Sequence, residues 1–448
     1  MFGIDFKRKS ILSNVELSFL RNFFIIVYFI STVSGFIQAQ NRADTLSSDG
    51  AWCWFSDPRA IYYKDEKEQI YFGYINSVGD VLIGVKDIET GAVHEFVLHD
   101  TLEVDDHNVT SILILPDGRL MVFYNEHNGN VYMRKSAFPE SIDRWEDERI
   151  VCRESEEFRY CYSNPVMLKG ENDRIYLIGR KVGPTSSFEH WWHYLKYSDD
   201  EGMTWSEEMI LLDNEGRKNP PYLKVATDHQ SRIDFLFTDG HPKIGPDVST
   251  YHMYFEHDSF FQTNGKFICA LENLPIPIKS VDKIYNAVPT QIRSWIWDIA
   301  LKDGIPYVTY ARYPTEHNHI YHYAYWQQDH WQDHEIVNSG SWMPSLRQGD
   351  MVREAHYSGG IVLDPLHPQH VYLSRDVSGK FEIEHCELQS GIYWKSELLT
   401  NNSGKNNVRP YMVYGAPTDR RFLMWMQGEY RHYTEFDTQL ILVSLEEK

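Results

Sequence analysis

The chain has 448 residues and a formal net charge of −21 at pH 7, and it contains 29 Tyr, 23 Phe and 13 Trp. So acidic a protein disfavours nucleic acid or an anionic membrane as partner, because both bind basic surfaces. The aromatic content, the scattered Pro and Gly and the lack of a long helical pattern favour an all-β domain, a class that can carry several hundred residues as one domain.

The N-terminal segment has the pattern of an export signal. Its basic residues are Lys7, Arg8, Lys9 and Arg21. They precede the apolar run NFFIIVYFISTVSGFIQAQ, which is short for a membrane span and ends in small and polar residues. We expect residues 1–39 to be a signal peptide cleaved near Ala39 and residues 40–448 to be a periplasmic or secreted domain. A retained membrane anchor is the alternative, because the basic region is long.

The cysteines are too few and too scattered for a disulfide scaffold. They are Cys53, Cys152, Cys161, Cys269 and Cys386. No Cys-x-x-Cys or Cys-x-His spacing marks a zinc site. Cys152 and Cys161 could pair across a loop, and the alternative is that the cysteines are buried free thiols.

One strand pattern recurs about every 50–60 residues, a period typical of propellers. Its second and third strands read, in chain order, IYFGYIN with VLIGVKD, LMVFYNE with VYMRKS, IYLIGRK with WHYLKYS, IDFLFTD with YHMYFEH, PYVTYAR with IYHYAYW, VYLSRD with FEIEHCE, and FLMWMQG with QLILVSL. Short strands bounded by turn residues predict antiparallel blades of four strands. The fold expected is an all-β, seven-bladed β-propeller.

The segment SDDEGMTW, from Ser198 to Trp205, fits the Asp-box pattern Ser-x-Asp-x-Gly-x-Thr-Trp. In this turn the Asp caps backbone N–H groups and the Trp packs into the sheet. We expect it to join the third and fourth strands of a blade and to have a structural role, far from chemistry.

The stretch DDHNVTSILILPDGRLMVFYNEHNG contains two histidines placed symmetrically about one turn. Asp117 is the midpoint of His107 and His127, and a Pro-Asp-Gly turn surrounds it. Residues symmetric about the turn of an antiparallel hairpin face one another. Both side chains are therefore expected at the open end of the hairpin, on the rim opposite the turn; core packing or a metal pair are the alternatives.

The next blade repeats this construction, since Tyr162 and Arg180 are symmetric about Glu171 in the turn KGEND. Because all blades run the same way, the four residues are expected to share one rim. The residues that end the second strand of successive blades are His127, Arg180, His241, Arg312 and Arg375. Cations gathered at one mouth of an acidic protein predict an anion site; the alternative is solvated strand ends.

A neutral base, a phenol and cations suit β-elimination from a uronic acid. The proton at C5 becomes acidic once the C6 carboxylate is neutralised, which Arg or protonated His can do. His can act as base near neutral pH, and Tyr can protonate the departing O4. Neither a pair of carboxylates for glycoside hydrolysis nor a Ser nucleophile motif is evident in the sequence.

The sequence resembles the BNR-repeat propeller group that includes the ulvan lyases and the rhamnosyl-glucuronate lyases, and it is similar to the related propeller α-L-rhamnosidases. The resemblance runs through DGAWCWFSDPRAIYY, HNVTSILILPDGRLMVFYNEHNG, YSNPVML, RIYLIGRK, FTDGHP, SGGIVLDP and VYLSRDVSGKFEIE. It implies that His107, His127, Tyr162 and Arg180 form the active site. One His and Tyr162 would share the base and acid roles, and Arg180 and the other His would neutralise the carboxylate.

The resemblance also places a further substrate-contacting Tyr near Tyr222, beside Lys224. With His241, Arg312 and Arg375, these are the expected substrate-binding residues. Some ulvan lyases hold a structural zinc with Cys and His; no matching run occurs here, so no metal site is predicted and no cofactor is required. A structural metal ion stays an open alternative.

The rhamnosidases use a His near the stretch WCWF-x-DPR, where this chain has Ser56. Asp57 and Arg59 are instead expected to form a buried structural pair. The expected function is therefore an exported, monomeric polysaccharide lyase acting on a rhamnose–uronate linkage of an acidic polysaccharide, of the ulvan or rhamnose-capped arabinogalactan type. It would have no membrane contact after signal removal. An α-L-rhamnosidase-type hydrolase and a non-catalytic glycan-binding propeller are the alternatives.

Overall fold

The computed structural model describes residues 43–183, 190–315, 318–340, 359–391 and 393–445. They belong to one compact unit that begins at Ala43. The expected signal peptide, residues 1–39, lies outside the described residues. Within the described ranges, no helix is long and apolar enough to cross a membrane.

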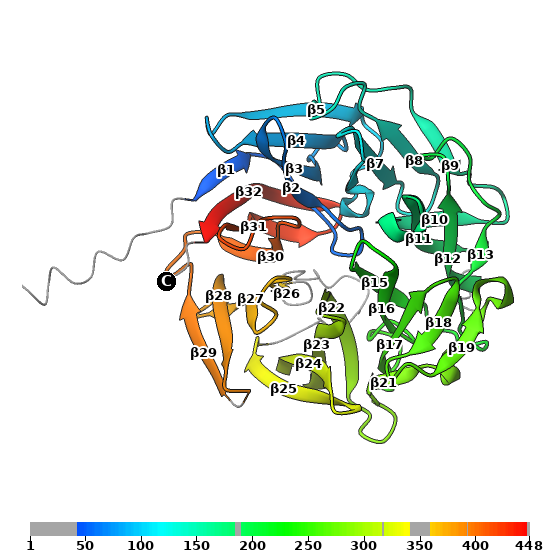
Figure 1. The fold of residues 1–448 in the computed structure, drawn as a ribbon. Coiled ribbons are helices and arrows are strands. Elements are labelled where there is room, and N and C mark those ends of the chain that lie inside the picture. The colour runs from blue at the N-terminus through cyan, green and yellow to red at the C-terminus, as the bar shows by residue number, and fades with distance from the viewer. Residues whose placement is uncertain (1–42, 184–189, 316–317, 341–358, 392, 446–448) are drawn as a thin grey trace, which may run out of the picture. The chain divides into compact units, whose positions relative to one another are not determined.

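Antiparallel sheets follow one another in chain order around a ring (Figure 1). The first sheet contains β2 (Ala60–Lys64), β3 (Glu68–Ile75), β4 (Val81–Asp87) and β5 (Val93–His99). The second contains β6 (Ser111–Ile114), β7 (Leu120–Asn125), β8 (Val131–Lys135) and β9 (Arg149–Cys152). The third contains β10 (Arg159–Leu168), β11 (Arg174–Val182), β12 (Trp191–Ser198) and β13 (Met209–Ile210).

The fourth sheet is larger than the four strands expected. It contains β15 (Tyr222–Thr227), β16 (Arg232–Thr238), β17 (Thr250–Glu256), β18 (Ser259–Gln262), β19 (Phe267–Ala270) and β21 (Asp282–Tyr285). The fifth contains β22 (Arg293–Lys302), β23 (Ile305–Thr315), β24 (Asn318–Gln327) and β25 (His330–Asn338). The sixth contains β26 (Ile361–Leu363), β27 (His370–Val377), β28 (Lys380–Gln389) and β29 (Tyr393–Leu398).

The seventh sheet closes the ring by joining the two ends of the described chain. It contains β30 (Asn406–Met412), β31 (Arg421–His432), β32 (Glu435–Leu445) and, as its outer strand, β1 (Asp44–Ser47). A parallel bridge between Ile61 and Tyr414 connects this sheet to the first one. The architecture is the expected seven-bladed β-propeller.

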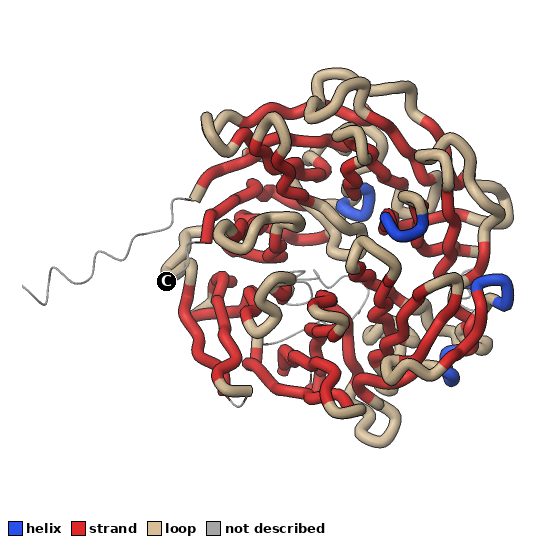
Figure 2. Tube along the Cα trace, in the orientation of Figure 1, coloured by secondary structure: helices blue, strands red, loops and turns tan. Residues whose placement is uncertain are grey.

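Few residues lie outside the strands and loops (Figure 2). The short 3-10 helices are η1 (Asp106–Asn108), η2 (Lys169–Glu171), η4 (Leu271–Asn273) and η5 (Ile278–Ser280). A separate parallel pair joins β14 (Leu212–Asp213) to β20 (Ile276–Pro277).

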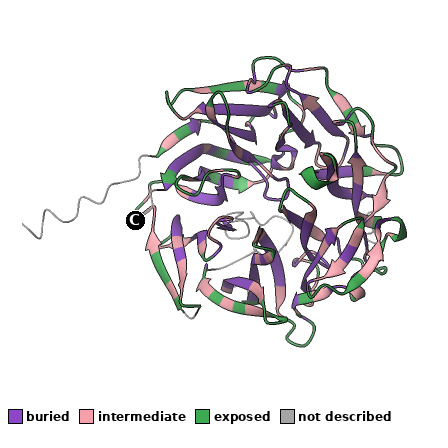
Figure 3. Cartoon of the chain, viewed as in Figure 1, coloured by how far each residue is buried: buried purple, intermediate pink, exposed green. Residues whose placement is uncertain are grey.

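The inner strands of each blade are buried and the outermost are mostly exposed (Figure 3). Strand β3 is buried at every position after its first, whereas β29 has no buried residue. An inner strand packs against both neighbouring blades, so its sequence reads as a nearly continuous apolar run rather than as an alternation. All seven predicted strand pairs are confirmed at the expected positions.

The Asp box forms the expected turn between β12 and β13. The Asp200 carboxylate accepts hydrogen bonds from the backbone N–H (2.8 Å) and hydroxyl (2.6 Å) of Thr204. The Trp205 ring packs edge-on against Phe123 of the preceding blade. The cysteines are free thiols, so Cys152 and Cys161 form no disulfide with each other.

Candidate active site

The two histidines meet at the open end of the β6–β7 hairpin, as the sequence symmetry predicts. The register pairs Ser111 with Phe123 and Ile114 with Leu120, which centres the hairpin on residue 117. His107 lies in η1 just before β6, and His127 follows β7. Their imidazole rings stack in parallel, with centroids 3.7 Å apart and an interplanar angle of 9°.

A single buried carboxylate joins both rings. Asp105 Oδ1 lies 2.6 Å from Nδ1 of His107, and Asp105 Oδ2 lies 2.8 Å from Nδ1 of His127. Because an ionised carboxylate only accepts hydrogen bonds, each Nδ1 must carry a hydrogen. The Nε2 atom of each ring therefore lies on the side away from Asp105.

The two imidazoles have opposite protonation tendencies. Burial disfavours charge on His107, but Asp105 and Asp106 outweigh burial and raise its pKa to about 9. Burial and the charge of His107 lower the pKa of His127 to about 4. Near neutral pH the pair thus combines one imidazolium with one neutral imidazole, which matches a cation beside a base.

Tyr162 and Arg180 are in contact, but they are not the directly opposed pair that the sequence symmetry predicts. The register pairs Arg180 with Cys161, not with Tyr162, and a bulge follows Cys161. Tyr162 occupies the bulge with a left-handed φ of 62°. The one-residue shift turns the phenol toward the guanidinium, whose carbon lies 4.6 Å from the ring centroid. The expected cross-strand pair is wrong in register, yet the two side chains are in contact.

Gly179 makes the bulge possible. A Cβ placed there would lie 2.6 Å from the Tyr162 carbonyl oxygen and 2.7 Å from the Tyr194 ring. Only glycine admits such a close approach of backbone. The Gly-Arg pair in IYLIGRK therefore serves to hold Tyr162 as well as to present Arg180.

Arg180 is a buried cation surrounded by aromatic rings. Its side chain is 1% exposed, and its guanidinium carbon lies 4.6 Å from the Trp191 centroid and 5.0 Å from that of Tyr222. Within the described residues, Nε and Nη1 have no hydrogen-bond partner and no carboxylate forms an ion pair with it. A buried guanidinium of this kind is incomplete without an anion, because desolvation of an unpaired charge is costly.

The remaining members of the cluster are Tyr222 at the start of β15 and His241 after β16. The Tyr222 ring lies 6.1 Å from Tyr162 and 5.4 Å from His241. Burial lowers the pKa of His241 well below its usual value, so this ring is neutral. Burial raises the pKa of Tyr162 well above its usual value despite Arg180, which keeps the phenol protonated.

The structure does not bring Lys224, Arg312 and Arg375 to this cluster, so the cationic rim is shorter than expected. Lys224 follows Tyr222 by two residues on β15, and its ammonium is buried in an ion pair with Asp57. Asp57 also pairs with Arg59 at 3.2 Å, the structural pair expected there. A position near the rim does not decide whether a cation is available to a substrate or is paired with a carboxylate of the protein.

The two arginines illustrate this point. Arg312 forms an ion pair with Asp333 and stacks over Tyr285, and Arg375 forms an ion pair with Glu384. Each partner carboxylate lies in the same blade as its arginine and neutralises it. The expectation that they extend the anion site is corrected accordingly.

Several residues of the site were not predicted from the sequence. Asp105 is one, although it precedes His107 by only two residues in the stretch DDHN. Tyr433, from the β31–β32 turn, packs edge-on against both histidines at 5.1 and 5.3 Å. Its carbonyl oxygen also accepts the N–H of Asp106 at 2.9 Å. No local signal connects Tyr433 with residues more than three hundred positions away.

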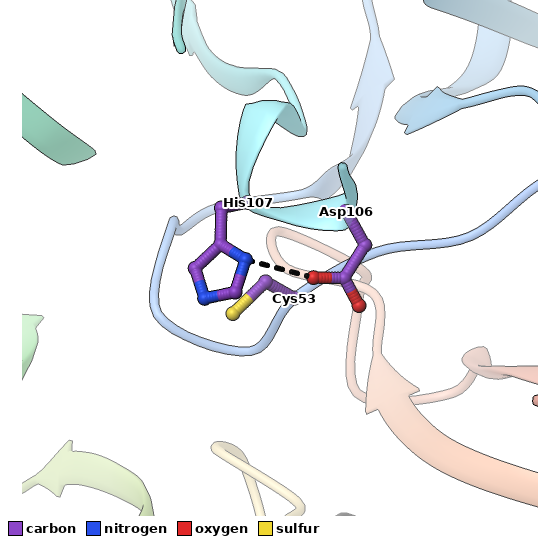
Figure 4. Close-up of side chains that lie close together, drawn as sticks. All are labelled: Cys53, Asp106 and His107. Carbon is purple, nitrogen blue, oxygen red and sulfur yellow. Dashed lines mark ion pairs between the residues drawn. The ribbon is translucent and has the colours of Figure 1, made fainter. Parts of the chain in front are cut away.

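Asp106 anchors the histidine-bearing turn to the core. Its buried Oδ2 accepts hydrogen bonds from Arg409 and Tyr430, and its Oδ1 lies 3.2 Å from Nδ1 of His107. Figure 4 shows Cys53 beside this pair. Burial raises the pKa of Cys53 far above its usual value, so the thiol stays protonated.

Donor atoms of Asp105, His107 and His127 lie near enough to one another for a metal ion, as do those of Cys53, Asp106 and His107. Hydrogen bonding accounts for this proximity. Both imidazole Nδ1 atoms donate to Asp105 and so have no lone pair to offer, and the Cys53 sulfur is not a thiolate. The donor set suits proton transfer better than metal binding.

Comparison with known proteins identifies the family of this chain. The model of the BNR repeat-containing family matches residues 69–339, more than half of the chain. No curated protein matches the sequence. Among solved structures, an ulvan lyase of polysaccharide lyase family PL25, bound to -[GlcA(1-4)Rha3S]-, has a TM-score of 0.68 at 14% identity, covering 90% of this chain and 96% of that chain.

Two further structures share the fold. A second PL25 ulvan lyase structure has a TM-score of 0.67 at 14% identity and covers 90% of this chain and 96% of that chain. The polysaccharide lyase Uly1 has a TM-score of 0.56 at 11% identity and covers 91% of this chain and 98% of that chain. At such identities the likeness concerns the fold. By the extent of its family match, the chain belongs to the BNR repeat-containing family of propeller proteins.

Proposed function

We propose that the protein is a polysaccharide lyase that cleaves a rhamnose–uronate linkage of an acidic glycan by β-elimination. The observation that carries the proposal is Arg180, a fully buried guanidinium with no ion pair among the described residues, lying against Tyr162 in the blade next to the histidine pair. A uronate carboxylate would supply the missing anion. Glycans of the ulvan or rhamnose-capped arabinogalactan type contain such a group.

Each group then has a role in elimination. The C6 carboxylate of the uronate binds Arg180, with the imidazolium of the histidine pair adding positive charge, which makes the C5 proton acidic. The neutral imidazole takes that proton, and the C5–H electron pair forms the C4–C5 double bond. The C4–O4 bond breaks as the protonated Tyr162 donates its proton to O4. The products are a 4,5-unsaturated uronyl sugar and the released chain end.

Hydrolysis fits the site less well. A glycosidase of the usual type needs two carboxyl groups placed on either side of the glycosidic bond. Asp105 is bonded to both imidazoles, and Asp106 is bonded to Arg409 and Tyr430. Neither is available for acid or base catalysis, whereas the phenol is available as an acid and the neutral imidazole as a base.

The N-terminal pattern supports export of the protein, and a periplasmic or external location would bring it to such glycans. The test of function is a product assay on ulvan and on gum-arabic-type glycans. Elimination gives an ultraviolet-absorbing unsaturated product whose mass is one water lower than that of the hydrolysis product. Release of hydrated, saturated sugar alone would replace the proposal with hydrolysis, and absence of any product from all uronate glycans would refute catalysis on this substrate class.

A further inference from the structure

We infer that Asp105 is a positioning residue that holds the two imidazoles in unlike protonation states, so that His127 is the base and His107 the fixed cation. The assignment rests on the proposed lyase function. Asp105 itself would touch neither substrate nor reacting atoms, and it would act only through the two rings.

The hydrogen bonds of Asp105 hold both imidazole rings. Oδ1 accepts from both Nδ1 (2.6 Å) and the backbone N–H (3.0 Å) of His107, while Oδ2 accepts from Nδ1 of His127 (2.8 Å). The Asp105 side chain is 3% exposed, so water does not compete effectively for these bonds. One carboxylate thereby fixes the tautomer and the orientation of both rings, as the third member of a catalytic triad fixes its histidine.

The surroundings of the rings differ, and this decides where the extra proton resides. His107 has a second carboxylate, Asp106, 3.2 Å from its Nδ1. His127 has no such second partner among the described residues, and the positive charge of Arg180 acts on it. Because the ring centroids are only 3.7 Å apart, the two imidazoles cannot readily both be charged. The proton therefore stays on His107.

Among the described residues, several ionisable groups lie around the pair. They are Glu103, Asp105, Asp106, Cys53, Cys161, Tyr162, Arg180, Arg409, His432 and Tyr433. The carboxylates nearest the rings favour His107⁺, and Arg180 disfavours His127⁺. The directions agree with the pKa of His107, raised to about 9, and with that of His127, lowered to about 4.

This arrangement gives the two histidines separate tasks. Neutral His127 has a free Nε2 lone pair on the side away from Asp105, as a base must have. When it takes the C5 proton, the Asp105 carboxylate is already in place to stabilise the new imidazolium. His107 is charged when the transfer begins and adds to the field that stabilises the enolate. The doubly charged pair that results is transient, because repulsion between the two rings favours rapid loss of the proton from His127.

The test is the pH profile of Asp105→Asn. Activity needs His107 charged, so the alkaline limb of kcat/KM follows the pKa of His107, about 9 in the wild type. Loss of the carboxylate lowers that pKa, and we expect the alkaline limb to move toward neutral pH while kcat/KM falls on the order of 100-fold. A uniform loss of activity with an unmoved alkaline limb would indicate a structural role and overturn the inference.

Glu103→Gln is the matched control. Its carboxylate accepts the backbone N–H of His127 at 3.0 Å and bonds to neither imidazole among the described residues. A glutamine retains an acceptor there, and we expect the alkaline limb to stay near its wild-type position. A shift of the alkaline limb as large as that in Asp105→Asn would show that any nearby negative charge, rather than the Asp105 carboxylate between the two rings, sets the protonation state of His107.

A ¹⁵N NMR titration of the histidines in substrate-free protein separates this inference from the proposed function. At pH 7 the wild type should show His107 protonated on both nitrogens and His127 on Nδ1 only, whether or not any glycan is cleaved. In Asp105→Asn, His107 should titrate at lower pH. Two histidines with similar titration midpoints in the wild type would overturn the inference, and this measurement does not depend on the folding of the variant.

Discussion

At the scale of single residues, the site gathers charges that the protein alone leaves unbalanced. Arg180 lies among aromatic rings without an ion pair in the described part of the chain. Arg409, equally buried, is paired with Asp106. We therefore expect substitution of the two arginines to change the free energy of unfolding in opposite directions.

We predict that Arg180→Met stabilises the fold and abolishes turnover. Removing a buried cation that lacks a counter-ion should raise the free energy of unfolding by about 1–3 kcal/mol, because an apolar chain of similar volume carries no desolvation cost. Chemical denaturation and the lyase assay measure the two effects.

Arg409→Met is the control for this variant. It leaves the buried Asp106 carboxylate without its cation and should lower the free energy of unfolding by about 3–5 kcal/mol. Equal destabilisation by both substitutions would show that Arg180 is satisfied within the free protein, contrary to the proposed anion site.

Tyr162→Phe should remove the proton donor and leave the packing intact. The ring contacts Phe55 and Arg180, and phenylalanine retains both contacts. We expect kcat to fall about 100- to 1,000-fold with little change in KM, as for a group that acts in the transition state. If the variant kept the kcat of the wild type, another group would have to donate the proton to O4.

At the scale of elements, hairpin registers decide which side chains meet. The β6–β7 hairpin keeps a regular register, so symmetry about its turn correctly predicts the histidine pair. In the β10–β11 hairpin a bulge shifts the register by one residue and places Cys161, not Tyr162, opposite Arg180. Bulges are frequent next to active sites because they re-aim a side chain, and here the side chain is Tyr162.

We predict that Gly179→Ala damages activity more than stability. A methyl group would meet the Tyr162 carbonyl at 2.6 Å, a backbone contact that cannot rotate away, so the bulge must move. Overpacking of this kind lowers the free energy of unfolding by about 1–3 kcal/mol, while displacing the phenol should reduce kcat far more.

Gly404→Ala serves as its comparison. A Cβ at Gly404 meets no atom within 4 Å, and the residue is exposed. Both stability and turnover should stay at wild-type values. If Gly179→Ala also left stability and turnover unchanged, the bulge would not be what positions Tyr162.

At the scale of the whole molecule, ring closure depends on four residues from the start of the described chain. Strand β1 completes the seventh blade by pairing with β32, and Leu46 is buried there. This closure holds the seventh blade, which contributes Arg409, Tyr430 and Tyr433 to the surroundings of the histidines.

We predict that a chain beginning at Ser48 is less stable than one beginning at Ala43 by about 2–3 kcal/mol, the scale of exposing one buried leucine. Strand β32 would also become an open edge, which favours association between copies. Urea unfolding and light scattering measure both effects. Identical unfolding curves for the two chains would show that the ring is held by the other blade contacts alone.

The repeat of strand and turn residues was sufficient to predict the propeller and all seven strand pairs, because blade strands are local in sequence and their turns carry clear signals. The same local symmetry brought His107 to His127. It did not find Asp105 as their shared partner. The series of strand-ending residues placed Arg312 and Arg375 at the site, and the family resemblance placed Lys224 there, although each is neutralised by a carboxylate elsewhere.

The sequence by itself thus determined the fold class, the blade order and the rim on which the histidines lie, since these follow from hydrophobic patterning and turn chemistry. Only the tertiary structure decided which charges are left unpaired. Ion pairs and ring contacts form between residues up to several hundred positions apart, such as Arg409 with Asp106 and Tyr433 with His127. Burial then sets whether each group is charged, and burial is a property of the packed molecule.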